Sequence, residues 1–283
     1  FTTSLEPQIL QRLQQISQAS GKTINWGNAV TGKTANTASD EKISAKVDWN
    51  ITSNQRLSVR YTTTEGEVPQ FGNFGGTSTT LNGVAGGILT TPDGHFYAQT
   101  RQEKTVAGQL NSQWSSNLST ELKYSQTTQD QATPLNTTAP MILIAGVAGN
   151  DAVNGAAVTN GAYIAGSEQF RHGNAIAVES QQMSAIATYA WKNFVFSGGF
   201  EREQSDFYNL FRAGSYGRVA YRNYADFLAD TNAVIERSAY DPTVRPIADV
   251  SEMATTGIFA QAKWDLNSRL SLTGLSLIHI SEP

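Results

Sequence analysis

The sequence predicts an all-β protein that forms part of the wall of an antiparallel transmembrane β-barrel, with about eight strands of a larger barrel and long external loops. Three observations predict this fold. Apolar and polar residues alternate along seven segments and a shorter eighth, the connections are alternately short and long, and a tryptophan stands just before each short connection. Barrels of the outer membrane have one apolar and one polar strand face, short periplasmic turns and longer outer loops.

The strands are identified by their period of two, because successive side chains of a β-strand point to opposite faces. Ile43, Val47 and Trp49, for example, alternate with Ser44 and Asp48. The apolar positions run from Ile43 to Ile51, Leu57 to Tyr61, Val106 to Trp114, Leu118 to Tyr124, Met183 to Trp191, Phe194 to Phe200 and Ile258 to Trp264, followed by Leu270 and Leu272.

The connections within each strand pair are short, at 50–56, 115–117, 192–193 and 265–269. Those between pairs are long, roughly 67–102, 132–179 and 208–254. Compact soluble domains seldom contain several such loops without structure of their own. The long loops are therefore expected outside the cell, where Tyr163, Phe170, Tyr216, Tyr221 and Tyr224 would carry ligand specificity.

Four tryptophans occupy the same place in their strand pairs, on the apolar side just before a short turn: Trp49, Trp114, Trp191 and Trp264. Indole prefers the membrane interface, where the ring is half buried and its N–H stays hydrated. We expect these four residues to form one membrane-interface belt, in contact with outer-membrane lipid. A soluble β-sandwich that buries them in one core is the alternative.

The polar strand face is expected to line a water-filled lumen or to contact a plug. Its candidate residues are Lys46, Asp48, Arg60, Gln109, Asn111, Glu121, Lys123, Gln261 and Lys263.

The chain divides into three parts. Residues 1–40 are predicted to be an external-loop segment with a short amphipathic helix through Leu10, Leu13 and Ile16, capped by Thr3 or Ser4. Residues 41–274 form the partial barrel. Residues 275–283, LSLIHISEP, resemble the translation of a sequencing adapter, and we exclude them from the functional argument.

The composition excludes several other classes of protein. A net charge of −4 without a basic block argues against nucleic acid as a partner. The chain has no cysteine, which excludes disulfides and thiolate metal sites. Its longest apolar run, APMILIAGVAG, is too short for a transmembrane helix.

The motifs that could carry chemistry are weak. Residues 27–34, GNAVTGKT, match the P-loop pattern, but polar sequence flanks them where a buried strand and a helix would be needed. His95 and His172 stand far apart in different loops, so we expect solvated side chains and no metal site. Glu201, Glu203 and Asp206 cluster near Arg202, and a solvated strand end is favoured over a hydrolytic pair. We expect no catalytic residues and no cofactor.

Several segments resemble barrel segments of TonB-dependent outer-membrane receptors, especially the large Oar-like group. They are EKISAKVDWNITSNQRLSVRYTTTEG, SEQFRHGNAIAVESQQMSAIATYAWKNFVFSGGFEREQSDFYNLF, GIFAQAKWDLNSRLSLTG and the loop tract YNLFRAGSYGRVAYRNYADFLAD. The resemblance implies a 22-stranded barrel around an N-terminal plug, in the outer membrane of a Gram-negative bacterium, energised by the inner-membrane TonB complex. The plug, the TonB-contacting box and the C-terminal strand are missing here, so contact with TonB belongs to the parent protein.

The implied function is receptor-mediated uptake of an extracellular ligand that the sequence does not name. Two other functions stay open. One is a passive or structural barrel, such as a porin or an adhesin, and the other is an outer-membrane hydrolase that uses Glu201 or Glu203.

Overall fold

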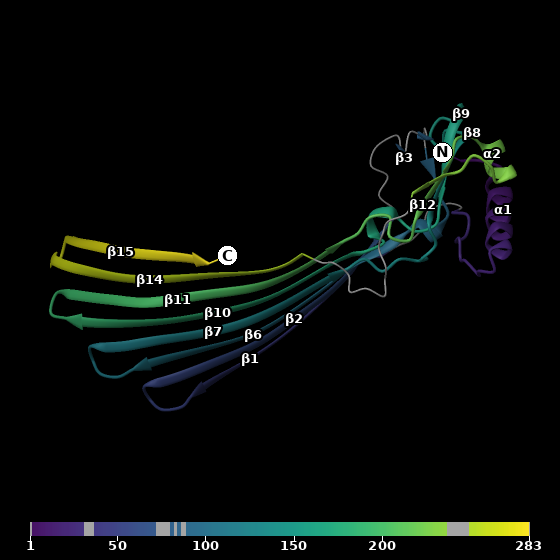
Figure 1. Ribbon diagram of the computed structural model, residues 1–283. Helices are drawn as coiled ribbons and strands as arrows, with labels where there is room; N and C mark the ends of the chain where they lie inside the picture. The colour runs from purple at the N-terminus through teal and green to yellow at the C-terminus, as the bar shows by residue number, and fades with distance from the viewer. Residues whose placement is uncertain are drawn as a thin grey trace.

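The computed structural model describes residues 2–30, 37–71, 80–81, 84–85, 89–236 and 249–282. It has two parts, a long curved sheet and a smaller module at one end of it (Figure 1). We call the first part the wall and the second the distal module, because it lies at the end of the wall opposite the short turns. Within the described ranges, no helix is long and apolar enough to cross a membrane.

The wall is an eight-stranded antiparallel sheet in the order β1-β2-β6-β7-β10-β11-β14-β15. Its strands are β1 (Ser39–Asn50), β2 (Gln55–Gln70), β6 (Tyr97–Gln113), β7 (Leu118–Ala132), β10 (Asn174–Trp191), β11 (Phe194–Phe211), β14 (Asp249–Asn267) and β15 (Leu270–Glu282). Neighbours along the chain pair through the predicted short turns. The predicted all-β fold is therefore confirmed, with β1 and β15 at open edges of a sheet that does not close on itself.

The strands are longer than their apolar alternation indicates, chiefly at the end away from the short turns. β10 begins at Asn174, although its apolar positions begin at Met183. In this outer part both faces carry polar groups. Glu179 and Asp206, for example, are direct partners on the face that carries Met183 farther down the strand. A strand that is polar on both sides has no period-two signal, which is why the sequence assigns these stretches to loops.

The end of β15 differs from the other strands. Leu272 pairs with Trp264 on the apolar face, whereas Leu275 pairs with Gln261 on the polar face, so the alternation reverses its phase there. The assignment of residues 275–283 to an adapter stays a prediction.

The distal module has its own five-stranded mixed sheet, in the order β13-β12-β8-β9-β5. Its strands are β5 (Leu89–Thr90), β8 (Met141–Asn150), β9 (Ala157–Ala165), β12 (Arg218–Tyr221) and β13 (Val234–Glu236). The apolar run of the sequence forms β8, which pairs with β12 in parallel and with β9 in antiparallel orientation. A strand buried on both faces reads as a continuous apolar run.

Apolar groups cover both faces of this sheet. On one side α1 (Glu6–Ala19) and α2 (Tyr224–Ala229) pack on it, with Ile9, Leu13 and Phe227 fully buried. On the other side Val84, in the short pair β3 (Thr80–Leu81) and β4 (Val84–Ala85), packs against Leu143. The long connections thus form a compact folded unit instead of open loops.

The predicted N-terminal helix is present as α1. Leu5 occupies the N-cap position, not Thr3 or Ser4, although Thr3 Oγ1 accepts a hydrogen bond from Leu5 N at 3.1 Å. The helix is anchored at its far end, where Trp26 Nε1 donates to Ser17 Oγ at 2.8 Å. Trp26 and Ser17 are both buried. The segment therefore belongs to the core of the distal module.

Candidate membrane and lumen surfaces

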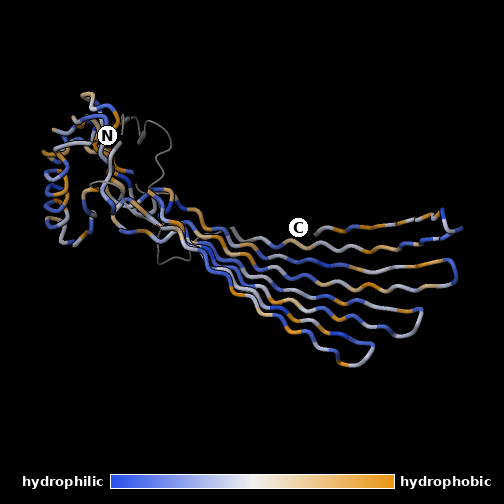
Figure 2. The backbone as a smooth tube through the Cα atoms, turned by 180° about the vertical axis from the view of Figure 1, so that it is seen from behind, coloured by the Kyte–Doolittle hydropathy of each residue, from blue (hydrophilic) through white to orange (hydrophobic). Residues whose placement is uncertain are grey.

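One face of the wall carries apolar side chains that are open to the surroundings. In Figure 2 hydrophobic and hydrophilic residues alternate along the strands. The register places Trp49, Leu57, Leu110 and Leu122 in a single row on this apolar face. Many of its large side chains are exposed, among them Val47 at 66% and Ile258 at 54%. A water-soluble sheet would cover such a face with another layer, and the distal module does not cover it (Figure 1).

The four tryptophans that precede short turns are all exposed, at 59% for Trp49, 60% for Trp114, 48% for Trp191 and 41% for Trp264. Trp191, Phe194 and Trp264 are direct register partners on three neighbouring strands. The Trp191 and Phe194 ring centroids are 6.1 Å apart. None of the four is buried in a core, so the structure does not follow the soluble-sandwich alternative.

The positions of the four tryptophans determine how far the strands must tilt for all four rings to lie at the same depth in the membrane. The register row that starts at Trp49 reaches Ile258 on β14, and Trp264 lies six residues closer to the short turns. Six residues span about 20 Å along a strand, and the six strand spacings span about 29 Å. A plane through the tryptophans therefore requires a strand tilt of about 35°, within the range of transmembrane barrels.

The opposite face is polar over most of the wall. All nine candidate lumen residues lie on it: Lys46, Asp48, Arg60, Gln109, Asn111, Glu121, Lys123, Gln261 and Lys263. Charged groups are paired there, since Lys46 Nζ lies 3.0 Å from Asp48 Oδ2 and Lys123 Nζ lies 2.6 Å from Glu121 Oε1. We call this surface the polar face.

One register row of the polar face consists of hydroxyl groups. Ser44, Thr62, Thr105, Thr127, Ser180 and Ser205 follow one another across six strands. Neighbouring hydroxyls contact each other at 3.2 Å between Ser44 and Thr62, 3.0 Å between Thr105 and Thr127, and 2.8 Å between Ser180 and Ser205. These mutual hydrogen bonds satisfy polar groups on a surface that carries no packed apolar core.

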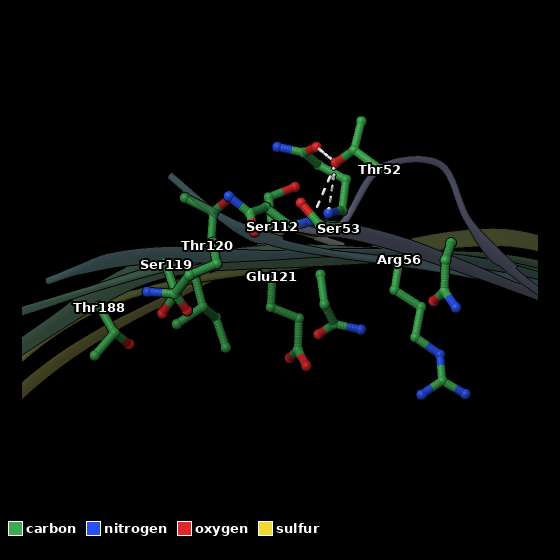
Figure 3. Close-up of a pocket in the computed structure, with 14 residues that line it drawn as sticks. Thr52, Ser53, Arg56, Ser112, Ser119, Thr120, Glu121 and Thr188 are labelled. Atoms are coloured by element: carbon green, nitrogen blue, oxygen red, sulfur yellow. Dashed lines mark hydrogen bonds between the residues drawn. The ribbon is translucent and has the colours of Figure 1, made fainter. Parts of the chain in front are cut away.

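A depression of about 590 Å³ lies at the short-turn end of the wall. Figure 3 views the sheet there from its edge: Arg56, Glu121 and Thr188 project from one side, and Thr52 lies in the turn on the other. Because its lining comes from both faces and from a turn, it is an open hollow at a sheet rim. We assign it no ligand.

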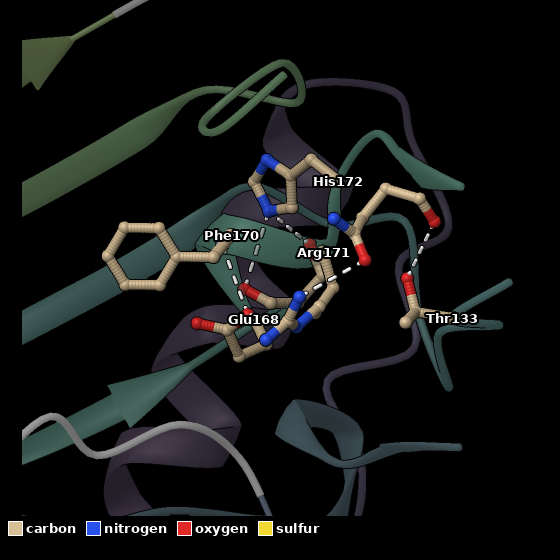
Figure 4. Close-up of polar contacts among 7 residues, drawn as sticks. Thr133, Glu168, Phe170, Arg171 and His172 are labelled. Atoms are coloured by element: carbon tan, nitrogen blue, oxygen red, sulfur yellow. Dashed lines mark hydrogen bonds and ion pairs between the residues drawn. The ribbon is translucent and has the colours of Figure 1, made fainter. Parts of the chain in front are cut away.

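The wall and the distal module meet at a polar cluster around η2 (Gln169–Arg171), shown in Figure 4. Arg171 Nη1 donates to Asn174 Oδ1 at 3.1 Å, and its guanidinium lies 5.4 Å from the centre of the Tyr97 ring. Thr133 Oγ1 donates to Asn174 O at 3.1 Å. These contacts join the beginnings of β6 and β10 to the residue that follows β7, and so fix the module to three strands of the wall.

Glu168 is buried beside this cluster. Its Oε2 accepts a hydrogen bond from Phe170 N at 3.1 Å and lies 3.8 Å from Arg171 Nε. Burial raises the pKa of this carboxyl to about 7, and the Phe170 N–H and the Arg171 charge offset only part of that effect.

The two loop histidines are buried, so the expectation that they are solvated is wrong. His172 Nδ1 accepts from Tyr216 N at 3.1 Å, and therefore its Nε2–H donates to Ser167 Oγ at 2.8 Å. Ser167 Oγ in turn donates to Ala139 O. His95 Nδ1 lies 2.9 Å from Gly166 O. Burial lowers the pKa of each imidazole to about 4, so both side chains are neutral at pH 7 and hold loop segments together through hydrogen bonds.

The five aromatic residues expected to carry ligand specificity differ in their burial. Tyr163 and Tyr221 are buried in the module core, where Tyr163 Oη donates to Glu6 Oε1 at 2.8 Å. Phe170 and Tyr224 are half-buried, and Tyr216 is exposed. The continuous apolar run of β8, MILIAGVAG, is the sequence signal that could have identified this core.

The remaining motifs do not assemble into catalytic sites. Gly27 packs against Gly94, and Asn28 N donates to Asp93 Oδ1 at 2.6 Å, so the start of the P-loop-like sequence is a packing contact. Lys33 and Thr34 lie outside the described residues. Glu201 and Glu203 lie within β11 on the polar face, while Asp206 is on the other face. Across the described ranges no group of His, Asp or Glu could hold a metal ion.

Comparison with known proteins places this architecture in a family. The family model described as "Outer membrane beta barrel domain" matches residues 2–274. The fold is similar to the outer membrane transporter YddB from Escherichia coli, with a TM-score of 0.44 and 8% identity over 86% of this chain and 34% of that one. The chain thus spans about a third of the transporter's length. No match is found among curated proteins. The chain belongs to the outer membrane β-barrel domain family and is part of a barrel in the outer membrane.

Proposed function

We propose that the chain is part of the barrel of a TonB-dependent receptor of the Oar-like group, which takes up an extracellular ligand. The observation that carries this proposal is the polar face of the wall. Eight strands can close into a small barrel whose interior is filled by side chains. Here the two edges stay open, and the polar face holds paired lysines and carboxylates that need water or a polar partner.

In this proposal the apolar face contacts lipid and the polar face lines a wide lumen. Trp49, Trp114, Trp191 and Trp264 form the belt at the periplasmic interface. The strand tilt of about 35° that their positions require supports this orientation, because outer-membrane strands tilt by about 35–45°.

The distal module is the outer, ligand-facing part. It is held to the wall by Arg171 and Asn174, and its own core keeps it folded above the membrane. Surfaces on a rigid scaffold are suited to ligand recognition. Energised transport belongs to the whole receptor, through a plug and a TonB-contacting segment.

The test uses the full-length parent protein. Photo-crosslinkers in its N-terminal region should capture the TonB protein in intact cells. In planar bilayers bathed in potassium chloride, the protein should show little steady conductance until a few molar urea unfolds the plug. A large, steady conductance without urea, together with no TonB crosslink, would contradict the proposal and identify a passive porin. No conductance in either condition, again without a crosslink, would indicate a structural barrel or adhesin.

A further inference from the structure

Arg202 is a cation on the apolar face of the wall, where the apolar part of that face gives way to its polar outer part. It lies in β11 and pairs with Met183 on β10 and Thr256 on β14. Tyr124 follows Met183 in the same register row. Arg202 Nη1 donates to Thr256 Oγ1 at 3.2 Å. Within the described part of the chain no carboxylate lies at ion-pair distance from Arg202, so most of its five N–H donors are available to a ligand.

The surroundings of Arg202 change from apolar to polar along the strands. On the side of the short turns lie the exposed side chains of Phe200 and Ile258, which are direct partners. On the other side, Gln204 and Gln181 pair in the next register row. The carboxylates of this face begin one row farther out, and Gln204 Nε2 donates to Glu252 Oε1 at 2.7 Å. The guanidinium therefore stands between an apolar surface and a row of amides.

The height of Arg202 above the tryptophans follows from the register. Arg202 is eight residues from Phe194, which pairs with both Trp191 and Trp264. Eight residues rise about 26 Å along a strand, or about 22 Å along the membrane normal at a tilt of about 35°. The apolar band of outer-membrane barrels is about 25 Å tall. This places the guanidinium at the outer boundary of the hydrocarbon layer.

We infer that Arg202 binds a phosphate of an outer-leaflet phosphoglycolipid whose acyl chains lie on Phe200 and Ile258 and whose sugar groups contact Gln204 and Gln181. A guanidinium binds a phosphate group through two parallel hydrogen bonds. This charged contact is stronger at the edge of the hydrocarbon layer than in bulk water, because the local dielectric constant is lower. Amides supply donors and acceptors for sugar hydroxyls. This inference rests on the membrane orientation given in the proposed function.

The test measures binding of diphosphoryl lipid A to the detergent-solubilised full-length protein by native mass spectrometry. Arg202→Gln should weaken binding roughly ten-fold, as expected for loss of a charged hydrogen bond. Arg202→Lys should keep part of the affinity. The matched control is Arg269→Gln, an equal loss of charge at the opposite end of the wall, which should leave the affinity unchanged.

A second measurement does not depend on any variant. Dephosphorylated lipid A should bind the wild-type protein about as weakly as diphosphoryl lipid A binds the Arg202→Gln variant. Millimolar inorganic phosphate should not displace the lipid. Equal affinities for the two lipids, or an unaffected Arg202→Gln variant, would overturn the inference. So would displacement by inorganic phosphate, which would make this a site for the free ion. A protein that binds no TonB but still shows the phosphate dependence would refute the receptor proposal alone.

Discussion

Trp264 stacks on Phe194 across the β11–β14 pair, with ring centroids 5.4 Å apart and planes 14° from parallel. Trp191 extends the stack on the other side of Phe194, at 6.1 Å. Cross-strand aromatic pairs contribute about 0.5–1.5 kcal/mol beyond the area that they bury. The end of the wall near the short turns is therefore stabilised by side chains that an aqueous protein would bury.

The first prediction concerns this stack. Trp264→Ala removes one ring and its cross-strand contact, and should lower the free energy of unfolding by about 1–3 kcal/mol. Trp264→Phe keeps a ring in place and should cost less than half as much. Urea-induced unfolding of the full-length protein in lipid vesicles measures both. Equal losses for the two variants would mean that ring stacking contributes nothing.

The second prediction compares two glycines with left-handed backbones. Gly166 has φ +79°, and a Cβ there would lie 1.9 Å from Pro140 O, whereas Gly155 has φ +73° with nothing within 4 Å. Gly155→Ala should cost about 1 kcal/mol, the penalty of the backbone conformation alone. Gly166→Ala should cost about 3 kcal/mol or more, because the clash adds to that penalty. Limited proteolysis of the module in increasing urea gives both values, and similar values would refute the packing described at Gly166.

The third prediction is a pH dependence of the distal module. The pKa values of His95 and His172 are lowered to about 4, so the stability that their neutral forms provide is present above about pH 6.5 and is lost as the pH falls toward 4. The pKa of Glu168 is raised to about 7, so its contribution is fully present below about pH 4.5 and is lost as the pH rises through 7. The stability lost on protonating two imidazoles exceeds the stability gained on protonating one carboxyl. The free energy of unfolding of the module should therefore fall below about pH 6.5.

Hydrogen exchange of residues 139–172, corrected for intrinsic rates, measures this loss between pH 7 and pH 5. Glu168→Gln removes the opposing group, so the loss on acidification should become steeper. Protection that is the same at pH 7 and pH 5 in the wild-type protein would contradict the burial of the two imidazoles.

The fourth prediction concerns topology. The turn between β8 and β9 is held by Asp151, whose Oδ1 accepts from Val153 N at 2.7 Å, and the Val153 side chain is 96% exposed. Elastase added to intact cells should cut at this tip, since exposed loop tips are preferred cleavage sites. The short turn at 51–54 should be cut only after the outer membrane is permeabilised. The opposite order of cleavage would reverse the orientation of the wall.

The alternation of apolar and polar residues was enough to predict the wall, because one face of each strand must be apolar near the membrane. Val47 and Ile258 show this pattern clearly. The outer halves of the same strands could not be predicted from it, since Glu179 and Asp206 make both faces polar there. The distal module was missed for the opposite reason, because β8 is apolar on both faces and shows no alternation.

The roles of single side chains in the module were also beyond the sequence pattern. Tyr163 and Tyr221 are as suited to a binding surface as to a core, and only the strands that surround them decide between the two. The burial of His95 depends on a contact with Gly166, and that of His172 on a contact with Tyr216, and both partners come from other loops. Such long-range contacts leave no periodic signal.

The central claim is that the apolar face of the wall contacts lipid and the polar face lines the lumen. Nitroxide labels on cysteines at Leu57, Ser58, Val59 and Arg60 test it most directly, because this chain contains no other cysteine. In the full-length protein in vesicles, labels at 57 and 59 should be accessible to molecular oxygen, and labels at 58 and 60 to a water-soluble nickel chelate. Accessibility without this period of two, or with its phase reversed, would contradict the account.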